Sequence, residues 1–165
     1  IDAAADFIKV TVNEQPEEDR LVITISDNGK GMDEALVKRA TDPFVTGRTT
    51  RKVGLGLSLL EAAAQRCDGG LNISSHPGVG TTVTARFRYG HIDRPPLGDL
   101  TQTIISLILC NPDINFIFRY LHGPREFKLD TREIRTYIGD IDISDIRIID
   151  WIREYVQAGI EGKID

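Results

Sequence analysis

Apolar residues occupy every second position in two short stretches near the start of the chain, residues 7–12 and 21–26. This alternation is the pattern of a strand that buries one of its faces. The positions expected to face the core are Ile8, Val10, Val12, Leu21, Ile23 and Ile25. The polar stretch between them, residues 13–19, predicts a turn, so we expect the two strands to pair as an antiparallel hairpin.

Helical spacing replaces this alternation in the next part of the chain. Asp33 is placed to cap a short helix over residues 34–40. A longer helix follows, and its apolar positions recur at the spacing of one helical face: Leu57, Leu60, Ala64 and Cys67. The sequence Asp-Gly-Gly at 68–70 is expected to end this helix by supplying left-handed conformers. A second hairpin then places apolar residues on one side: Val83, Ala85, Phe87 and Tyr89.

Paired prolines within residues 90–98 mark a boundary, because they stop any regular element. Beyond it the pattern predicts an amphipathic helix, a hairpin around residues 122–124, a short helix and a last helix. Asp130 and Glu133 form a capping-box pattern at the start of the short helix. The last helix has an apolar face made of Ile148, Trp151, Ile152 and Tyr155.

This order of elements predicts an α+β sandwich with a layer of helices on one face of a sheet. We expect a first domain over residues 1–90 and a small α+β C-terminal appendage over residues 91–165. Trp151 and Tyr155 are expected to help the appendage form a core of its own. An exposed aromatic patch there would instead favour a partner site.

The composition is that of an ordinary globular chain and excludes several classes of protein. The 165 residues are 41% hydrophobic and 27% charged, with a formal net charge of −5. This charge argues against a nucleic-acid partner. No apolar run approaches the length of a membrane span, and the N-terminus does not look like a signal peptide. Cys67 and Cys110 have neither zinc-site nor disulfide spacing, so we expect a cytoplasmic protein whose thiols act as small hydrophobes.

Two glycine loops carry the candidate chemistry: "DNGKG" at residues 27–31 and "GLGLS" at 54–58. Neither has the spacing of a Walker A loop, a dinucleotide-binding fingerprint or an EF-hand. The second loop stands at the start of a predicted helix, where backbone N–H groups and a partial positive charge suit an anion. Arg48, Arg51 and Lys52 lie just upstream. These features predict a phosphate-binding site, whereas either loop alone would fit a tight turn beside a solvated basic segment.

The order of the motifs resembles that of the GHKL ATPase superfamily, which includes gyrases, heat-shock chaperones, histidine kinases and mismatch-repair ATPases. The resemblance covers residues 1–89 and rests on "DNGKG", "DPFVTG", "GLGLS" and "GVGTTVT" in this order. It implies the Bergerat fold, a two-layer α/β sandwich with a mixed, mainly antiparallel sheet and helices on one face. It also implies ATP and Mg²⁺ as cofactors.

The resemblance also implies roles for single residues. Asp27 would accept a hydrogen bond from the adenine amino group, and Thr81 or Thr82 would reach the adenine through a water molecule. Phe44 would pack beneath a mobile lid that runs from about Thr46 to Val53. The whole set of implied nucleotide-binding residues is Asp27, Gly29, Gly31, Met32, Phe44, Arg48, Thr50, Lys52, Gly54, Leu55, Gly56, Leu57, Thr81 and Thr82.

The first residues, "IDAAAD", resemble the tail of the helix that carries the N box of this superfamily, with Asp2 at the position of the box's Asp. The Asn that holds Mg²⁺ would lie two residues before Ile1, and the catalytic base further upstream. We therefore expect this chain by itself to be impaired in phosphoryl transfer, which depends on positioning and on Mg²⁺.

Within the superfamily the motifs look most like the catalytic domain of histidine kinases. The chain's three histidines, His76, His91 and His122, fall in predicted turns or at the boundary, so an acceptor would lie on another chain. The segment after residue 90 resembles the tail of small stand-alone ATP-binding proteins associated with iron-hydrogenase gene clusters. Three hypotheses follow: a kinase-like domain that phosphorylates a partner protein in trans, an ATP-gated switch in which lid closure alters a protein-binding surface of residues 97–165 without phosphotransfer, and a structural module without nucleotide. The expected partner protein is a phosphoacceptor or a redox-enzyme complex.

Overall fold

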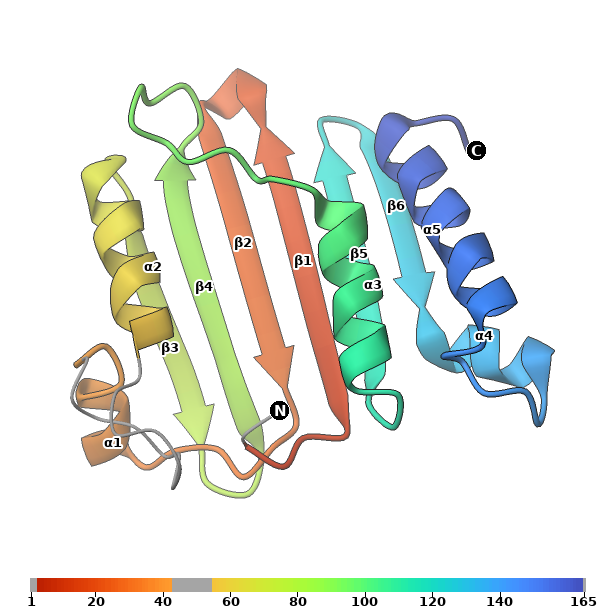
Figure 1. The fold of residues 1–165 in the computed structure, drawn as a ribbon. Helices are drawn as coiled ribbons and strands as arrows, with labels where there is room; N and C mark the ends of the chain where they lie inside the picture. Colours follow the sequence, from red (N-terminus) through yellow and green to blue (C-terminus); the bar gives the residue numbers. More distant parts are fainter. Residues whose placement is uncertain (1–2, 43–54, 165) are drawn as a thin grey trace.

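One sheet of six strands runs through the whole computed structural model, which describes residues 3–42 and 55–164 (Figure 1). The strands are β1 (Phe7–Gln15), β2 (Arg20–Asp27), β3 (Gly70–His76), β4 (Gly80–Arg88), β5 (Asn115–His122) and β6 (Arg125–Asp130). The helices are α1 (Glu34–Lys38), α2 (Leu55–Arg66), α3 (Leu100–Cys110), α4 (Thr131–Ile138) and α5 (Ile146–Glu161). A 3₁₀ turn, Pro16–Glu18, joins β1 to β2.

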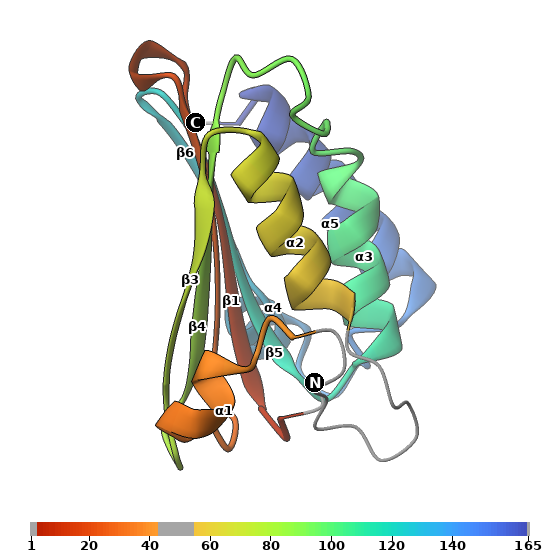
Figure 2. The same ribbon diagram turned by 90° about the vertical axis from the view of Figure 1, so that its left-hand side faces the viewer.

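The sheet is mixed and mainly antiparallel. Its strand order is β3-β4-β2-β1-β5-β6, and β1 and β5 are the parallel pair. Figure 2 shows α2, α3 and α5 together on one face of this sheet. This architecture confirms the expected α+β fold with two layers and helices on one face.

The period-two pattern placed the first hairpin correctly. β1 pairs with β2 in antiparallel register, with Ile8 opposite Asp27 and Val12 opposite Ile23. Ile8, Val12 and Leu21 are buried on the face that the helices cover. Ile25 lies on this same face but is 39% exposed, close to the end of β2. An apolar side chain is therefore accessible at that end of the sheet.

Local polar contacts fix the helix ends, partly as predicted. The Asp33 side chain accepts a hydrogen bond of 2.8 Å from the backbone N–H of Leu36, which confirms it as the cap of α1. The prediction for residues 68–70 is confirmed, because α2 ends at Arg66 and a left-handed residue follows, which is Asp68 with a φ of 53°. Gly69 is required for another reason: a Cβ there would overlap the backbone carbonyl of Arg86.

The first described residues are not helical. Residues 3–6 form a turn and a bend, and Ala4 has a φ of 55°, outside the right-handed helical region. The expected helical tail at "IDAAAD" is therefore wrong for residues 3–6. Ile1 and Asp2 lie outside the described residues.

Residues 91–165 add to the sheet of the first half. β5 pairs along β1 from Phe7–Asn115 to Glu14–His122, and β6 forms the outer edge beyond it. Buried side chains of both halves, such as Val12, Ile105 and Ile152, belong to one core cluster. The expectation that the C-terminal segment forms a core of its own was wrong, since its strands extend an existing sheet. The domain boundary between residues 90 and 91 stays a prediction about the organisation of the chain.

The aromatic residues of α5 divide between core and surface. Trp151 is 51% exposed and stacks on Tyr155, with ring centroids 5.3 Å apart and planes nearly parallel. Tyr155 in turn lies 5.2 Å from the ring of Phe127 on β6. Trp151 therefore does not serve as the core residue that the sequence pattern predicted.

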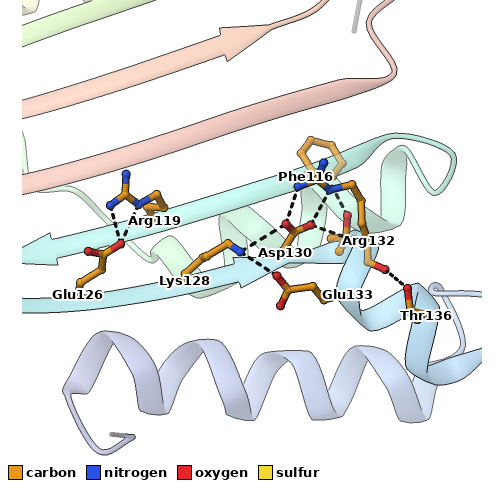
Figure 3. Close-up of polar contacts among 9 residues, drawn as sticks. Phe116, Arg119, Glu126, Lys128, Asp130, Arg132, Glu133 and Thr136 are labelled. Atoms are coloured by element: carbon orange, nitrogen blue, oxygen red, sulfur yellow. Dashed lines mark hydrogen bonds and ion pairs between the residues drawn. The ribbon is translucent and has the colours of Figure 1, made fainter.

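A buried carboxylate joins β6 to α4 (Figure 3). Asp130 is 5% exposed and accepts hydrogen bonds from Nε and Nη2 of Arg132 at 3.0 and 2.7 Å and from the Arg132 backbone at 3.1 Å. Next to it, the hydroxyl of Thr131 accepts a bond of 2.8 Å from the backbone N–H of Phe116 on β5. These contacts anchor α4 to the outer strands of the sheet.

The Asp130 contacts predict how stability responds to acid. The Arg132 side chain, followed by the Arg132 backbone N–H and the charge of Lys128, holds the pKa of Asp130 below its usual range. A lowered folded-state pKa stabilises the fold above the unfolded pKa near 4, and this stability is lost as the pH falls through the folded value. We expect Asp130→Asn to lower the free energy of unfolding by about 1–2 kcal/mol at pH 7.

Urea unfolding between pH 7 and the lowest pH at which the protein stays folded would measure this effect. The difference between the parent protein and Asp130→Asn should shrink below about pH 4. Glu126→Gln, at an exposed ion pair with Arg119, is the control and should change stability by less than about 0.5 kcal/mol. A difference for Asp130→Asn that stays constant with pH would contradict the assigned role.

Candidate functional site

The loop that follows β2 lies between two other backbone segments. Its residues 27–32 contact residues 3–7 on one side and the β3–β4 turn, residues 75–80, on the other. Figure 1 shows that β2 ends, β4 begins and α2 begins at this same end of the sheet. The motifs "DNGKG" and "GVGTTVT" are therefore adjacent in space. The motif "GLGLS", from Leu55 on, begins α2 at the same end of the molecule.

Asp27 is the last residue of β2 and is half-buried. It lies opposite Ile8 of β1 and Thr81 of β4, so its side chain is on the face of the sheet that carries the helices. One carboxylate oxygen, Oδ1, accepts a hydrogen bond of 2.8 Å from the backbone N–H of Gly29. The exposed Ile25 lies two residues earlier on the same face. A hydrogen-bond acceptor thus stands beside accessible apolar surface.

The strand register distinguishes Thr81 from Thr82, which the sequence left as alternatives. Thr81 lies opposite Asp27, and its hydroxyl is 2.8 Å from that of Ser75. Thr82 points to the opposite face of the sheet, where its hydroxyl donates to Ser26 at 3.0 Å. Only Thr81 shares a face with Asp27.

The glycines of the first loop permit close approach between backbone segments. A Cβ at Gly29 would overlap Ala3, and a Cβ at Gly31 would overlap the carbonyl of His76. Gly31 also has a φ of 65°, and Gly80, whose Cβ would overlap the carbonyl of Asp27, has a φ of 129°. These three glycines are therefore needed to assemble the loop itself, in addition to any approach by a ligand.

Two residues that the sequence interpretation missed hold the loop in place. Asn28 Oδ1 accepts hydrogen bonds from the backbone N–H groups of Asp6 and Phe7 at 3.2 and 3.0 Å, and its Nδ2 donates to the Asp6 carboxylate at 2.5 Å. Ser75 Oγ accepts from the Met32 backbone at 2.8 Å and donates to the Gly80 carbonyl at 2.9 Å. Asn28 follows Asp27 in a turn-forming sequence, which is the signal that could have identified it.

The start of α2 presents backbone N–H groups that have no partner within the helix. The first N–H groups of a helix have no partner within the helix, and they create a partial positive charge. Leu55 is 51% exposed, and a Cβ at Gly56 would meet no heavy atom within 4 Å, so no described neighbour requires glycine there. Leu57 is half-buried. The predicted site residues Phe44, Arg48, Thr50, Lys52 and Gly54 lie outside the described residues.

No three His, Cys, Asp or Glu side chains within residues 3–42 and 55–164 are arranged to hold a metal ion. Over the same residues, no helix has both the length and the apolar character that crossing a membrane requires.

Comparison with known proteins adds family information. A sequence profile of the family described as histidine kinase-, DNA gyrase B-, and HSP90-like ATPase matches residues 1–91. The chain is 36% identical over 75 residues to the sensor histidine kinase YxdK of Bacillus subtilis (strain 168), which covers 43% of this chain and 23% of that protein. It is 37% identical over 70 residues to the signal transduction histidine-protein kinase AtoS of Escherichia coli (strain K12), which covers 42% of this chain and 11% of that protein. The chain thus spans less than a quarter of either relative's length.

The fold is also similar to a solved structure, the N-terminal domain of a DNA repair protein. The TM-score is 0.55 at 16% sequence identity, over 86% of this chain and 54% of that chain. At this identity the likeness concerns the fold alone. Because it covers 86% of the chain, it includes part of the segment beyond residue 91.

The close approach at Gly31 predicts a marked loss of stability on substitution. In Gly31→Ala, the positive φ would cost about 1 kcal/mol, and the overlap with the His76 carbonyl would add about 1–3 kcal/mol. Gly78→Ala is a matched control, because Gly78 has a similar φ of 75° and its Cβ would meet nothing within 4 Å. Urea unfolding of both variants should show the larger loss for Gly31→Ala, and equal losses would contradict the close approach.

Proposed function

Since the chain belongs, through residues 1–91, to the family of histidine kinase-, DNA gyrase B- and HSP90-like ATPases, we propose that the end of the sheet around Asp27 binds ATP. The observation that carries this proposal is the placement of Asp27 and Thr81 side by side on the helix-covered face, next to the exposed Ile25. A carboxylate, a hydroxyl and accessible apolar surface suit a planar base that bears an amino group.

Asp27 has the capacity to bind this amino group. A carboxylate can accept about four hydrogen bonds, and the backbone N–H of Gly29 uses one of them. The Gly29 bond and the Asn28 contacts hold the loop in a fixed position, which lowers the entropy lost on binding. Thr81 supports the base from β4, whereas Thr82 has no part in this site. Met32, Gly29 and Gly31 belong to the same loop as Asp27, and the Met32 backbone N–H donates to Ser75 Oγ.

The phosphates of ATP would lie at the N-terminus of α2. The first N–H groups of a helix have no partner within it and attract an anion, and the absence of a side chain at Gly56 leaves room beside the backbone among the described residues. Leu55 and Leu57 flank this glycine in the first turn. The remaining predicted site residues, Phe44, Arg48, Thr50, Lys52 and Gly54, belong to the same proposal on the basis of the sequence motifs.

Mg²⁺ enters this proposal through the nucleotide. Mg²⁺ in nucleotide sites is bound by phosphate oxygens, water and one or two carboxylates. The described residues present no ready-made cluster of metal ligands, so we assign no residue of this chain to the ion. When bound, Mg²⁺ would neutralise the phosphate charge.

The reaction proposed for the bound ATP is phosphoryl transfer to a partner protein in trans. Histidine kinases are among the relatives that this chain resembles, and they are far longer than this chain. The chain's own histidines are poor candidates for an acceptor on a helix: His76 ends β3, His91 lies in a loop and His122 ends β5. A cytoplasmic location fits a protein that uses ATP and is part of this proposal.

A second candidate function, an ATP-gated switch, is favoured by the sheet itself. β1 begins at Phe7, whose backbone N–H is bound by Asn28 of the candidate ATP loop, and pairs along its length with β5. Nucleotide-dependent movement of this loop would act on β1 and through it on the C-terminal strands. Binding of a partner protein to residues 91–165 would then depend on ATP without phosphoryl transfer.

Calorimetric titration of a non-hydrolysable ATP analogue, with and without Mg²⁺, would test the binding site. We expect saturable binding that Asp27→Asn weakens by about 10- to 100-fold, because a hydrogen bond to a charged group contributes about 1.5–3 kcal/mol. Asp33→Asn is the matched control, since Asn also caps helices, and should bind as the parent chain does.

A second pair of variants would test the register of the site. Thr81→Val should weaken binding several-fold, whereas Thr82→Val, on the other face of β4, should leave it unchanged. Equal affinities for Asp27→Asn and Asp33→Asn, or a larger effect of Thr82→Val than of Thr81→Val, would contradict the proposed site.

Transfer and switching predict different behaviour of the bound chain. For transfer, label from γ-labelled ATP should appear as protein-bound phosphate on a second protein in a cell extract, and Asp27→Asn should abolish this label. For the switch, the ATP analogue should slow amide hydrogen exchange in β1 and β5 without any labelled protein. Exchange that changes only in residues 27–32 and in α2 would contradict the switch.

A further inference from the structure

A second cleft lies at the end of the sheet opposite to Asp27. It has a volume of about 480 Å³ and is enclosed by the start of α3, the C-terminal half of α5, and the ends of β1 and β5. Figure 1 shows these element ends together at the top of the view, whereas β2 ends at the bottom. The volume lies within the range of small-molecule sites. Leu97, Leu100 and Ile160 give the cleft an apolar wall.

The floor of this cleft holds a buried carboxylate. Glu14, near the end of β1, is 8% exposed and faces the helix layer. The hydroxyl of Tyr120 donates a hydrogen bond of 2.5 Å to its Oε1. Burial, and then this bond to Glu14, raise the pKa of Tyr120, so the phenol stays protonated as a donor. Burial and the charge of Glu14 also raise the pKa of the nearby Tyr89.

Among the described residues, Glu14 has the Tyr120 hydroxyl as a hydrogen-bond partner and no cation. Within the described part of the chain no Lys, Arg or His side chain forms an ion pair with it, although a buried charge is costly unless it is paired. Arg94 and Arg125 approach the two tyrosines but donate to the backbone carbonyls of Tyr89 and Glu161. The structure thus places a buried carboxylate, with no cationic partner among the described residues, at the floor of an open cleft.

The rim of the cleft adds one more carboxylate that has no ion pair among the described residues, the exposed Asp99, whereas Arg153 is the cation of the lining. Glu161 also lies on the rim, but its carboxylate forms an ion pair with Lys163 at 2.5 Å. The Arg153 guanidinium is directed to the side chain of Gln102, whose Oε1 accepts its hydrogen bond at 2.9 Å. Asp99 Oδ1 accepts from the Gln102 backbone at 2.8 Å as the cap of α3. Glu14 and Asp99 are therefore the lining carboxylates that a bound cation could pair with.

From this geometry we propose that the cleft binds a small aliphatic amine, with its ammonium group next to Glu14 and its carbon chain against the apolar wall. An organic cation fits better than a metal ion, because the described carboxylates do not converge into a metal-binding cluster. Glu14 lies at the floor and Asp99 at the rim, so a diamine can place one ammonium group beside each carboxylate. A diamine should therefore bind more tightly than a monoamine. This site does not depend on the proposed ATP site.

Calorimetry on the full chain in about 100 mM salt would test the site. At this concentration, exposed charges that are separated by more than roughly 10 Å are largely screened from each other. The probes are 1,4-diaminobutane, n-butylamine and, as an anion of similar size, butyrate. We expect saturable binding of both amines, tighter for the diamine, and none of butyrate. Glu14→Gln, which keeps an oxygen acceptor for Tyr120, should weaken amine binding at least tenfold.

Two further variants distinguish loss of the binding site from loss of the fold. Glu17→Gln, at an exposed glutamate of the turn after β1, is the matched control and should bind as the parent chain does. Asp99→Asn keeps an acceptor at the cap of α3 and should weaken diamine binding several-fold, which decides the question if Glu14→Gln fails to fold. The absence of saturable amine binding, equal affinity in Glu14→Gln and Glu17→Gln, or binding of butyrate as tight as that of the amines would overturn the proposal.

Discussion

The pairing of β1 on both of its edges is the constraint on which the rest of the structure depends. β2 binds one edge in antiparallel register, and β5 binds the other in parallel register over eight residue pairs from Phe7–Asn115 to Glu14–His122. Parallel neighbours need a crossover connection, and here the chain passes through β2, α1, α2, β3, β4 and α3 before it returns as β5. The two halves of the sequence are joined by these backbone hydrogen bonds into one sheet with one core.

Close approach between backbone segments imposes the second constraint, at the candidate ATP loop. Gly31 and Gly80 accept positive φ values where their missing side chains let the loop, the end of β2 and the β3–β4 turn meet. Gly31 and Gly80 are thus needed for backbone contacts within the protein, whether or not a nucleotide approaches the loop. At Gly56 no described neighbour occupies the corresponding space, so in the proposed function this glycine leaves room for a ligand.

Much of the fold could be predicted from the sequence because its local signals agree with the final packing. Alternation located the hairpin of Ile8 and Val12, and Asp33 marked the start of α1. The parallel partner of β1 could not be predicted, because alternation in β5 says that one face is buried but does not say which edge it joins. The same lack of register left Thr81 and Thr82 equivalent in the sequence, although they lie on opposite faces. At the helix end, the sequence could not tell which residue of 68–70 is left-handed: Asp68 has the positive φ, whereas Gly69 is needed because a Cβ there would overlap the Arg86 carbonyl.

The two ends of β1 lie beside two different candidate sites, and this follows from which residues its pairing brings together. At its start, the Asn28 side chain binds the backbone of Asp6 and Phe7 and so ties β1 to the Asp27 loop. Near its end, Glu14 is buried beneath α3 and α5, elements that only the C-terminal half of the chain provides. Without the β5 pairing, Tyr120 would not reach Glu14, and this carboxylate would stand at an open sheet edge. The C-terminal segment therefore does more than extend the sheet: it converts an edge position of the ATPase-family domain into the floor of a second cleft.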